Sequence, residues 1–193
     1  MRDRAQMRRA VELLIFDLDG TLVDSRQDLA ASVNHALGRL GLPPLSVETV
    51  AGFVGDGAQA LLTRALVAAR GVADEAEVEA GLRAFREHYA AHLLDATRSY
   101  PGVPEALQAL SHKAMAVATN KPRAYALAIL EGLGLHQHFR LVVGDSPHDV
   151  AMARAVGCGA CAVTYGLRPR EELVAAAPDF LLDDLRDLPS LIR

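Results

Sequence analysis

The sequence has few cysteines, no excess of positive charge and no long hydrophobic run, and each of these absences argues against a class of site or protein. Its 193 residues include only two cysteines, Cys158 and Cys161. A zinc site would need two further ligands, so we expect two reduced structural thiols. The net charge of −4 gives no overall positive field for nucleic acid or membranes. The apolar run at 13–16 is too short for a signal peptide or a membrane span, which predicts a cytoplasmic protein.

The pattern along the chain predicts an α/β fold. Hydrophobic residues make up 51% of the sequence and charged residues 23%, as in an ordinary globular protein. Short apolar runs alternate with helical patterns, which is typical of a parallel sheet with crossover helices. The expected strands are residues 13–17, 114–120, 141–145, 161–166 and 179–182.

Residues 26–95 contain no strand pattern and form three amphipathic helical stripes instead. One stripe includes Leu29, Val33 and Leu37, and another runs from Val78 to Leu93. The segment therefore predicts a helical insertion between the first strand and the rest of the sheet. We expect a core domain from residues 1–24 and 97–193, and a helical cap domain from residues 25–96.

Carboxylates follow two of the expected strands. Asp17 and Asp19 come directly after the first strand, and Asp145 and Asp149 follow the third. Ligands of parallel sheets bind beyond the carboxyl ends of the strands, so these side chains should converge. Four carboxylates in one crevice repel each other unless a cation binds, and oxygen ligands of this kind suit Mg²⁺.

A phosphate group is a plausible guest beside such a cation. Backbone N–H groups at Gly20 and at the turn formed by Thr119 and Asn120 can bind its oxygens. One aspartate could then attack phosphorus while the second protonates the leaving oxygen. Taken singly, these residues also fit turns and helix caps, as do Ser25 and Asp28, which match a capping box. Three strand ends with the same polar character are harder to explain in that way.

The motifs resemble those of the haloacid dehalogenase superfamily of aspartate-nucleophile phosphatases. The matching stretches are DLDGTLVDS (17–25), TNK (119–121) and GDSPHDV (144–150). The stretch FVGDGAQALLTRAL (53–66) is similar to the cap of phosphoglycolate phosphatases. The resemblance implies a doubly wound, Rossmann-like parallel sheet with an inserted α-helical cap. It also implies a Mg²⁺-dependent phosphomonoester hydrolase that acts on a small phosphorylated metabolite, with phosphoglycolate favoured.

The resemblance also implies a role for each matching residue. Asp17 would be the nucleophile that becomes an aspartyl phosphate, and Asp19 the general acid and base. Arg64 in the cap would meet a substrate carboxylate. The implied metal ligands are Asp17, Asp19, Asp145 and Asp149, and the implied phosphate-binding residues are Gly20, Thr119, Asn120 and Lys121.

The third motif of the family, a lysine, has no counterpart after Lys121. Only 24 residues lie between Thr119 and Gly144, where the family carries about 30 more, roughly one βαβ-sized unit. Losing one preorganised charge costs about 10²–10³ in rate, so we expect weak activity or none. Lys121 and Arg123 are better placed than Arg140 to substitute. The alternatives are a truncated relative that only binds Mg²⁺ or phosphate, and another capped activity such as a sugar-phosphate mutase or a pyrophosphatase.

The shortened segment also predicts a strand order. Without the family's edge strand, residues 114–120 would form an apolar edge, and residues 141–145 would lie on the other side of the first strand. The helix near 122–133 would then carry the chain past the first strand. An apolar edge strand invites pairing with another chain, so a homodimer through residues 114–120 is a hypothesis.

Overall fold

The computed structural model describes residues 11–139, 141–144, 161–166, 170–175 and 177–191. Its strands are β1 (Leu13–Phe16), β2 (Val23–Asp24), β3 (Arg98–Ser99), β4 (Ala114–Thr119), β5 (Leu141–Gly144), β6 (Cys161–Val163) and β7 (Phe180–Leu182). Its helices are α1 (Arg26–Arg39), α2 (Val47–Ala51), α3 (Gly57–Arg70), α4 (Glu75–Ala91), α5 (Val103–Ala109), α6 (Arg123–Gly132), α8 (Arg170–Ala175) and α9 (Leu188–Leu191), with 3₁₀ turns η2 (His136–His138) and η3 (Leu185–Asp187).

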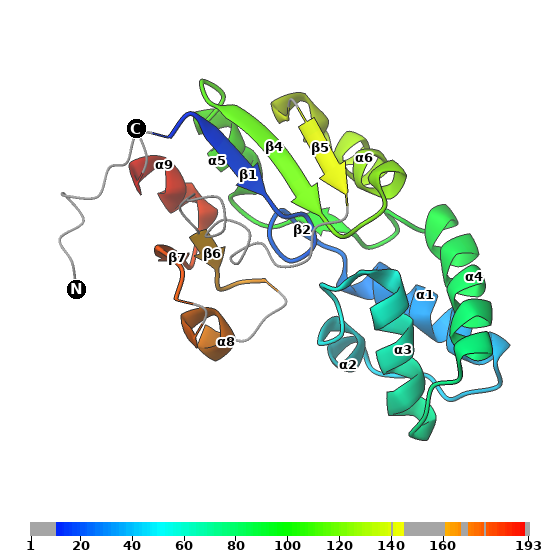
Figure 1. The fold of residues 1–193 in the computed structure, drawn as a ribbon. Helices are drawn as coiled ribbons and strands as arrows, with labels where there is room; N and C mark the ends of the chain where they lie inside the picture. Colours follow the sequence, from blue (N-terminus) through cyan, green and yellow to red (C-terminus); the bar gives the residue numbers. More distant parts are fainter. Residues whose placement is uncertain (1–10, 140, 145–160, 167–169, 176, 192–193) are drawn as a thin grey trace.

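A parallel sheet in the order β1-β4-β5 forms the centre of the molecule (Figure 1). Phe16 in β1 pairs with Val117 in β4, and Thr119 in β4 pairs with Gly144 in β5. Residues 115–119 of β4 are all buried, as expected for a central strand covered on both faces. The three strands run in one direction, toward the group of helices α1–α4 (Figure 1).

The predicted strand order is wrong, because β5 lies beside β4 and not beside β1. One short helix, α6, connects β4 to β5, and such a connection reaches a neighbouring parallel strand without crossing a third. Both edges of β4 are therefore paired, so residues 114–120 are not an exposed edge. The physical basis for a homodimer through these residues is lost.

Strands β6 and β7 pair with each other in a separate two-stranded parallel sheet. The α/β class is therefore as predicted, and the five expected strands form, each shortened by up to three residues. Strand β1 is less buried than β4. Leu13 and Ile15, two residues apart on the same face of β1, are 52% and 58% exposed.

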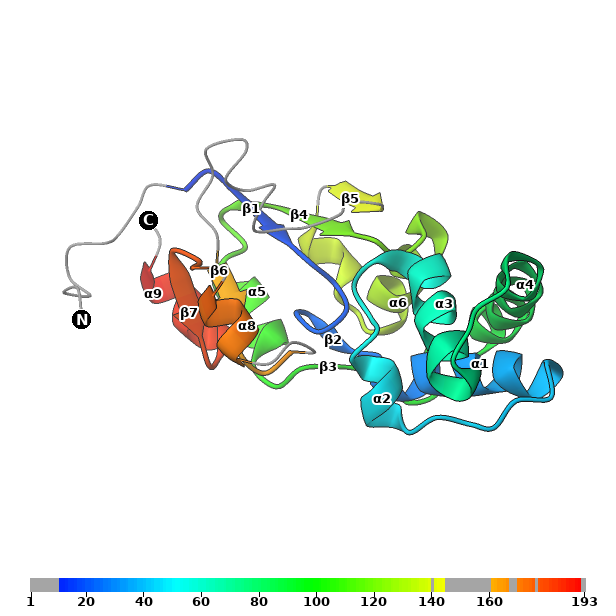
Figure 2. The ribbon, with the colours of Figure 1, turned by 60° about the horizontal axis from the view of Figure 1, so that its bottom comes forward.

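Helices α1–α4 form a group of their own, as the periodicity of residues 26–95 predicts. Their apolar stripes meet in a hydrophobic cluster that includes Leu37, Leu62 and Phe85, separate from the cluster beneath the sheet. The short antiparallel pair β2–β3 brings the departing and returning chain segments together at the junction between the helices and the sheet (Figure 2). The division into two domains at residues 25 and 96 remains a prediction. No helix in the described ranges is long and apolar enough to cross a membrane.

A buried carboxylate ties the two junction segments together. Asp28, in the first turn of α1, is 4% exposed. It accepts hydrogen bonds from the backbone N–H groups of Ala96 and Thr97, at 2.9 and 2.8 Å, and from the Thr97 hydroxyl at 2.7 Å. The predicted capping box is wrong, because the Ser25 side chain makes no cap hydrogen bond to α1 and bonds to Asp19 instead.

Candidate active site

The loop after β1 presents Asp17 and Asp19 at the carboxyl end of the sheet. Phe16, Leu18 and Gly20 are buried, whereas the two aspartates between them are half-buried. This alternation is that of an extended chain, which directs Asp17 and Asp19 away from the side occupied by Leu18. The Leu18 carbonyl accepts the N–H groups of residues 21, 22 and 23, which tightens the loop. Gly20 has a φ of 86°, a backbone conformation that favours glycine.

The carboxylate of Asp19 is held from two sides. The Ser25 hydroxyl donates to Asp19 Oδ1 at 2.5 Å. The ammonium of Lys121 lies 3.2 Å from Asp19 Oδ2. The first partner comes from the chain that leads into the helices, and the second from the end of β4. Asp19 therefore joins two strand ends at one point, as the sequence predicts for this crevice.

The segment after β4 provides the second side of the site. Thr119 is 3% exposed, and its hydroxyl oxygen accepts the backbone N–H of Lys121 at 3.3 Å. The Asn120 side chain donates to the Gly55 carbonyl at 2.5 Å, which fixes the loop before α3 beside the end of β4. The ion pair of Lys121 with Asp19 thus brings the loop that contains Gly20 to the turn of Thr119 and Asn120, and phosphate binding by these residues remains a prediction.

Lys121 is the cation that reaches this crevice among the described residues. Its side chain is 4% exposed, whereas Arg123 is exposed at the start of α6, and Arg140 lies outside the described residues. Its ammonium donates to the Tyr89 hydroxyl at 2.5 Å and lies 4.5 Å from the centre of the Tyr89 ring. Burial lowers the pKa of Lys121, but Asp19 and Tyr89 outweigh it and hold that pKa above its ordinary value. Lys121 is therefore charged at neutral pH.

The structure describes two of the four predicted metal ligands, Asp17 and Asp19, and their binding of Mg²⁺ remains a prediction. Asp17 and Asp19 supply hard oxygen donors of the kind that Mg²⁺ prefers. Asp145 and Asp149 lie outside the described residues, and within those residues no group of three His, Cys, Asp or Glu side chains forms a metal cluster. Strand β5, which leads into Asp145, lies two strands from β1, about 10 Å away by ordinary strand spacing.

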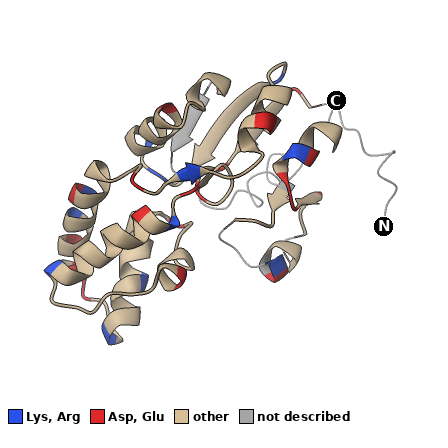
Figure 3. Ribbon diagram, turned by 180° about the vertical axis from the view of Figure 1, so that it is seen from behind, with Lys and Arg blue, Asp and Glu red and all other residues tan. Residues whose placement is uncertain are grey.

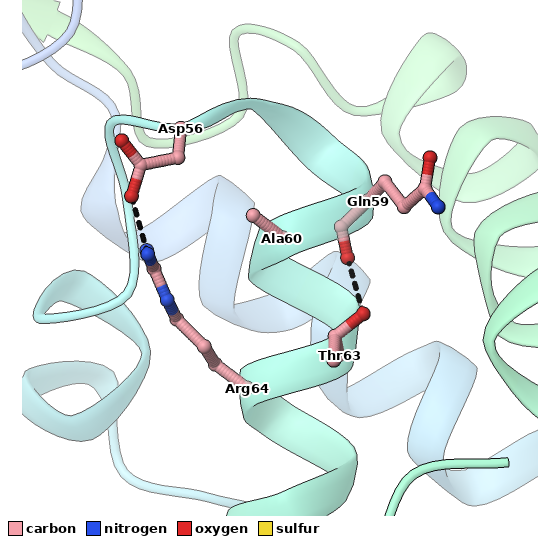
Figure 4. A pocket seen from close by; sticks show the side chains of 5 residues that line it. All are labelled: Asp56, Gln59, Ala60, Thr63 and Arg64. Carbon is pink, nitrogen blue, oxygen red and sulfur yellow. Dashed lines mark hydrogen bonds and ion pairs between the residues drawn. The ribbon is translucent and has the colours of Figure 1, made fainter. Parts of the chain in front are cut away.

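Arg64 lies in the group of helices, where it lines an open hollow of about 450 Å³ together with Asp56, Gln59, Ala60 and Thr63 (Figure 4). Its guanidinium forms an ion pair with Asp56 and donates to the Phe53 carbonyl at 2.9 Å. The predicted partner of Arg64 is a substrate carboxylate. In this structure its charge is already engaged by the loop that precedes α3.

One interaction at the site and two elsewhere on the helices were not predicted. Tyr89 lies within the predicted apolar stripe from Val78 to Leu93, yet its hydroxyl contacts Lys121. The rings of His35, His88 and His92 stack in succession, with centroids 4.5 and 4.3 Å apart, and His92 pairs with Asp95 at 2.7 Å. The i, i+4 spacing of His88 and His92, with Asp95 three residues after His92, is the sequence signal that could have indicated this group. Charges of both signs are interspersed over the helices (Figure 3).

Two family models match the chain. One, described as haloacid dehalogenase-like hydrolase, matches residues 14–144, and a second, HAD-hydrolase-like, matches residues 118–188. The two matches overlap between residues 118 and 144, the segment in which the sequence falls short of the family pattern.

Curated relatives and solved structures agree with these matches. Phosphoglycolate phosphatase 1 of Pseudomonas aeruginosa is 36% identical over 218 residues, covering 93% of this chain and 79% of the relative. The phosphoglycolate phosphatase of Chromobacterium violaceum is also 36% identical over 218 residues, covering 95% and 97%. The crystal structure of a predicted phosphoglycolate phosphatase from Haemophilus somnus is 31% identical, with a TM-score of 0.85 and coverage of 92% and 96%. Since the alignments exceed 193 residues, the relatives carry residues that this chain lacks.

Proposed function

Because the chain belongs to the haloacid dehalogenase-like hydrolase family, we propose that it hydrolyses a small phosphomonoester and favours phosphoglycolate. The predicted phosphatase class is confirmed by the family and by relatives named phosphoglycolate phosphatase. The observation that carries the finer proposal is the meeting of Asp19 with Lys121 at the carboxyl ends of β1 and β4. This contact brings the loop of the two aspartates to the Thr119–Lys121 turn.

The reaction that we propose uses Asp17 as the nucleophile. Its carboxylate oxygen forms a bond to phosphorus while the bond from phosphorus to the alcohol oxygen breaks, which leaves an aspartyl phosphate. Asp19, in its protonated form, gives its proton to the leaving alcohol. A water oxygen then bonds to phosphorus as the bond from Asp17 to phosphorus breaks, Asp19 takes a proton from that water, and phosphate leaves. Ser25 supports this role, because its hydroxyl holds the Asp19 carboxylate in one orientation.

The phosphoryl group would be bound by Gly20, Thr119, Asn120 and Lys121. An ammonium has three N–H donors, and Asp19 and Tyr89 take two of them in the described structure. The third can donate to a phosphoryl oxygen. In this proposal Lys121 does the work of the missing third-motif lysine.

Mg²⁺ is part of the proposal because two carboxylates alone would repel an anionic substrate. Asp17 and Asp19, with Asp145 and Asp149, are the residues that would hold it. When bound, the ion would neutralise phosphoryl charge and orient the group toward the nucleophile.

Two features support phosphoglycolate as the substrate. The relatives named above carry that activity in their names, and Arg64 could bind a carboxylate if it exchanged Asp56 for the substrate. A cytoplasmic location remains a prediction. The alternative function, a weak or inactive relative that only binds Mg²⁺ or phosphate, is favoured by the shortened segment.

The test is phosphate release from phosphoglycolate and from an aryl phosphate, with Mg²⁺ and with a chelator, by the full chain and by Asp17→Asn. We expect release that depends on Mg²⁺ and that falls to background in Asp17→Asn. Arg64→Gln should raise KM for phosphoglycolate and leave the aryl phosphate unaffected. If the folded wild-type chain releases no more phosphate than Asp17→Asn, the enzyme proposal is wrong and the binding-only alternative stands.

A further inference from the structure

Lys121 is a buried charge whose partners come from three separate parts of the chain. The lysine follows β4, Asp19 follows β1, and Tyr89 lies on α4 among the inserted helices. Isolated ammonium groups are expensive to bury, and they persist in protein interiors only with a paired charge and satisfied hydrogen bonds. Asp19 supplies the charge, and Tyr89 supplies a hydrogen-bond acceptor and an aromatic ring face.

The position of Tyr89 is rigidly determined by its neighbours. The side chain is 1% exposed, and its ring stacks on Phe85 with centroids 5.4 Å apart. The ring of Tyr125, on α6, meets it edge-on at 5.7 Å. Burial raises the pKa of Tyr89 to about 12, so its hydroxyl stays protonated at neutral pH. A rigid neutral acceptor of this kind can hold a flexible lysine side chain in one place.

The lysine side chain needs such support because it is long and has four rotatable bonds. Asp19 alone would restrain the ammonium at one point, and a second fixed partner converts that contact into a defined position. The ring of Tyr89 adds cation–π attraction, which is strongest where water is excluded.

We propose that Tyr89 is a positioning residue that holds the Lys121 ammonium against Asp19, so that an inserted helix sets the location of the positive charge at the phosphoryl site. This inference rests on the proposed function for its catalytic consequence. The placement of the ammonium itself can be measured without turnover. Removal of the Tyr89 hydroxyl should loosen the restraint on the ammonium, leaving Asp19 and the ring face as its partners, while the apolar packing of the ring is retained.

The first experiment follows the Lys121 ammonium by NMR of the full chain labelled with ¹⁵N-lysine. The sequence contains only two lysines, Lys113 and Lys121, and Lys113→Arg assigns the signals. We compare Tyr89→Phe with Tyr125→Phe, which also removes one tyrosine hydroxyl but does not touch the ammonium. Hydrogen exchange of the Lys121 ammonium should accelerate about tenfold in Tyr89→Phe and stay unchanged in Tyr125→Phe, because one bond to a charged donor is lost.

The second experiment uses inorganic phosphate as the probe and phosphoglycolate turnover as the readout. Phosphate binding to Tyr89→Phe should weaken about tenfold, and kcat/KM for phosphoglycolate should fall by a similar factor, because the ammonium loses the hydrogen bond to the Tyr89 hydroxyl that fixes its position. In a chain that already carries Lys121→Met, the further change Tyr89→Phe should not weaken phosphate binding any more.

Two results would overturn the inference. Equal ammonium exchange in Tyr89→Phe and Tyr125→Phe would show that Tyr89 does not restrain Lys121. Faster exchange with unchanged phosphate binding would show that the restraint has no consequence at the site. If the wild-type chain binds phosphate but releases none from phosphoglycolate, the positioning role survives and only the proposed function fails.

Discussion

The buried carboxylate of Asp28 offers a sharp test of how the inserted helices are joined to the sheet. Its partners, Ala96 and Thr97, lie 68 and 69 residues further along the chain, where the helical segment returns. Asp28→Ala removes the acceptor for two backbone N–H groups and one hydroxyl. We expect the variant to lose about 3 kcal/mol in the free energy of unfolding.

That magnitude follows from the burial of each donor. Thr97 is 1% exposed, so in the variant its backbone N–H is buried without an acceptor. Such an unsatisfied donor lowers the free energy of unfolding by about 2 kcal/mol. The Thr97 hydroxyl can rotate, and the half-buried Ala96 N–H can bind water, so together they add about 1 kcal/mol. Thr97→Val, which removes only the hydroxyl, should cost about 1 kcal/mol. Asp28→Asn should fall between the two because it keeps one acceptor oxygen.

The assay is urea unfolding at pH 7 followed by circular dichroism, since the chain contains no tryptophan. Gln27→Ala is the matched control, because Gln27 is the exposed neighbour of Asp28 in the same helical turn and should change stability by under about 0.5 kcal/mol. The double variant Asp28→Ala with Thr97→Val should cost less than the sum of the two single variants. A loss for Asp28→Ala no larger than that of Gln27→Ala would refute the reasoning.

Two further predictions concern the loop beside Asp19 and the histidine stack. A Cβ added at Gly166 would overlap the Gly20 carbonyl, so Gly166→Ala should lose about 1–3 kcal/mol of stability and displace the Asp19 loop. The control is Gly38→Ala, where space is open and no stability should be lost. Thermal unfolding of the two variants measures the difference. Desolvation, His35 and His92 hold the pKa of His88 below its ordinary value of 6.5, despite the opposing charge of Asp95. The unfolded chain therefore binds a proton more readily than the folded chain, so the stability of the wild type should fall as pH drops through 6.5. This fall should be smaller in His88→Gln, and in the exposed control His112→Gln it should be as large as in the wild type.

Local patterns in the sequence were sufficient to predict the fold class, the helical insertion and the aspartate loop. The loop at 17–25 is continuous in the chain, and its alternation of apolar and acidic residues shows which side chains are buried. The periodicity of α1, α3 and α4 likewise shows which face of each helix is apolar. These predictions held because each depends on residues within a few positions of one another.

The tertiary structure decided which strand lies beside which, and which groups meet Lys121. An apolar strand such as residues 141–144 fits beside β1 or β4 equally well by its pattern, and the short α6 connection placed it beside β4. Tyr89 has the spacing of a core residue, and nothing in its neighbourhood along the chain shows that its hydroxyl reaches a lysine 32 residues away. Periodicity identifies a buried face but not the group that covers it, because that depends on how distant elements pack together.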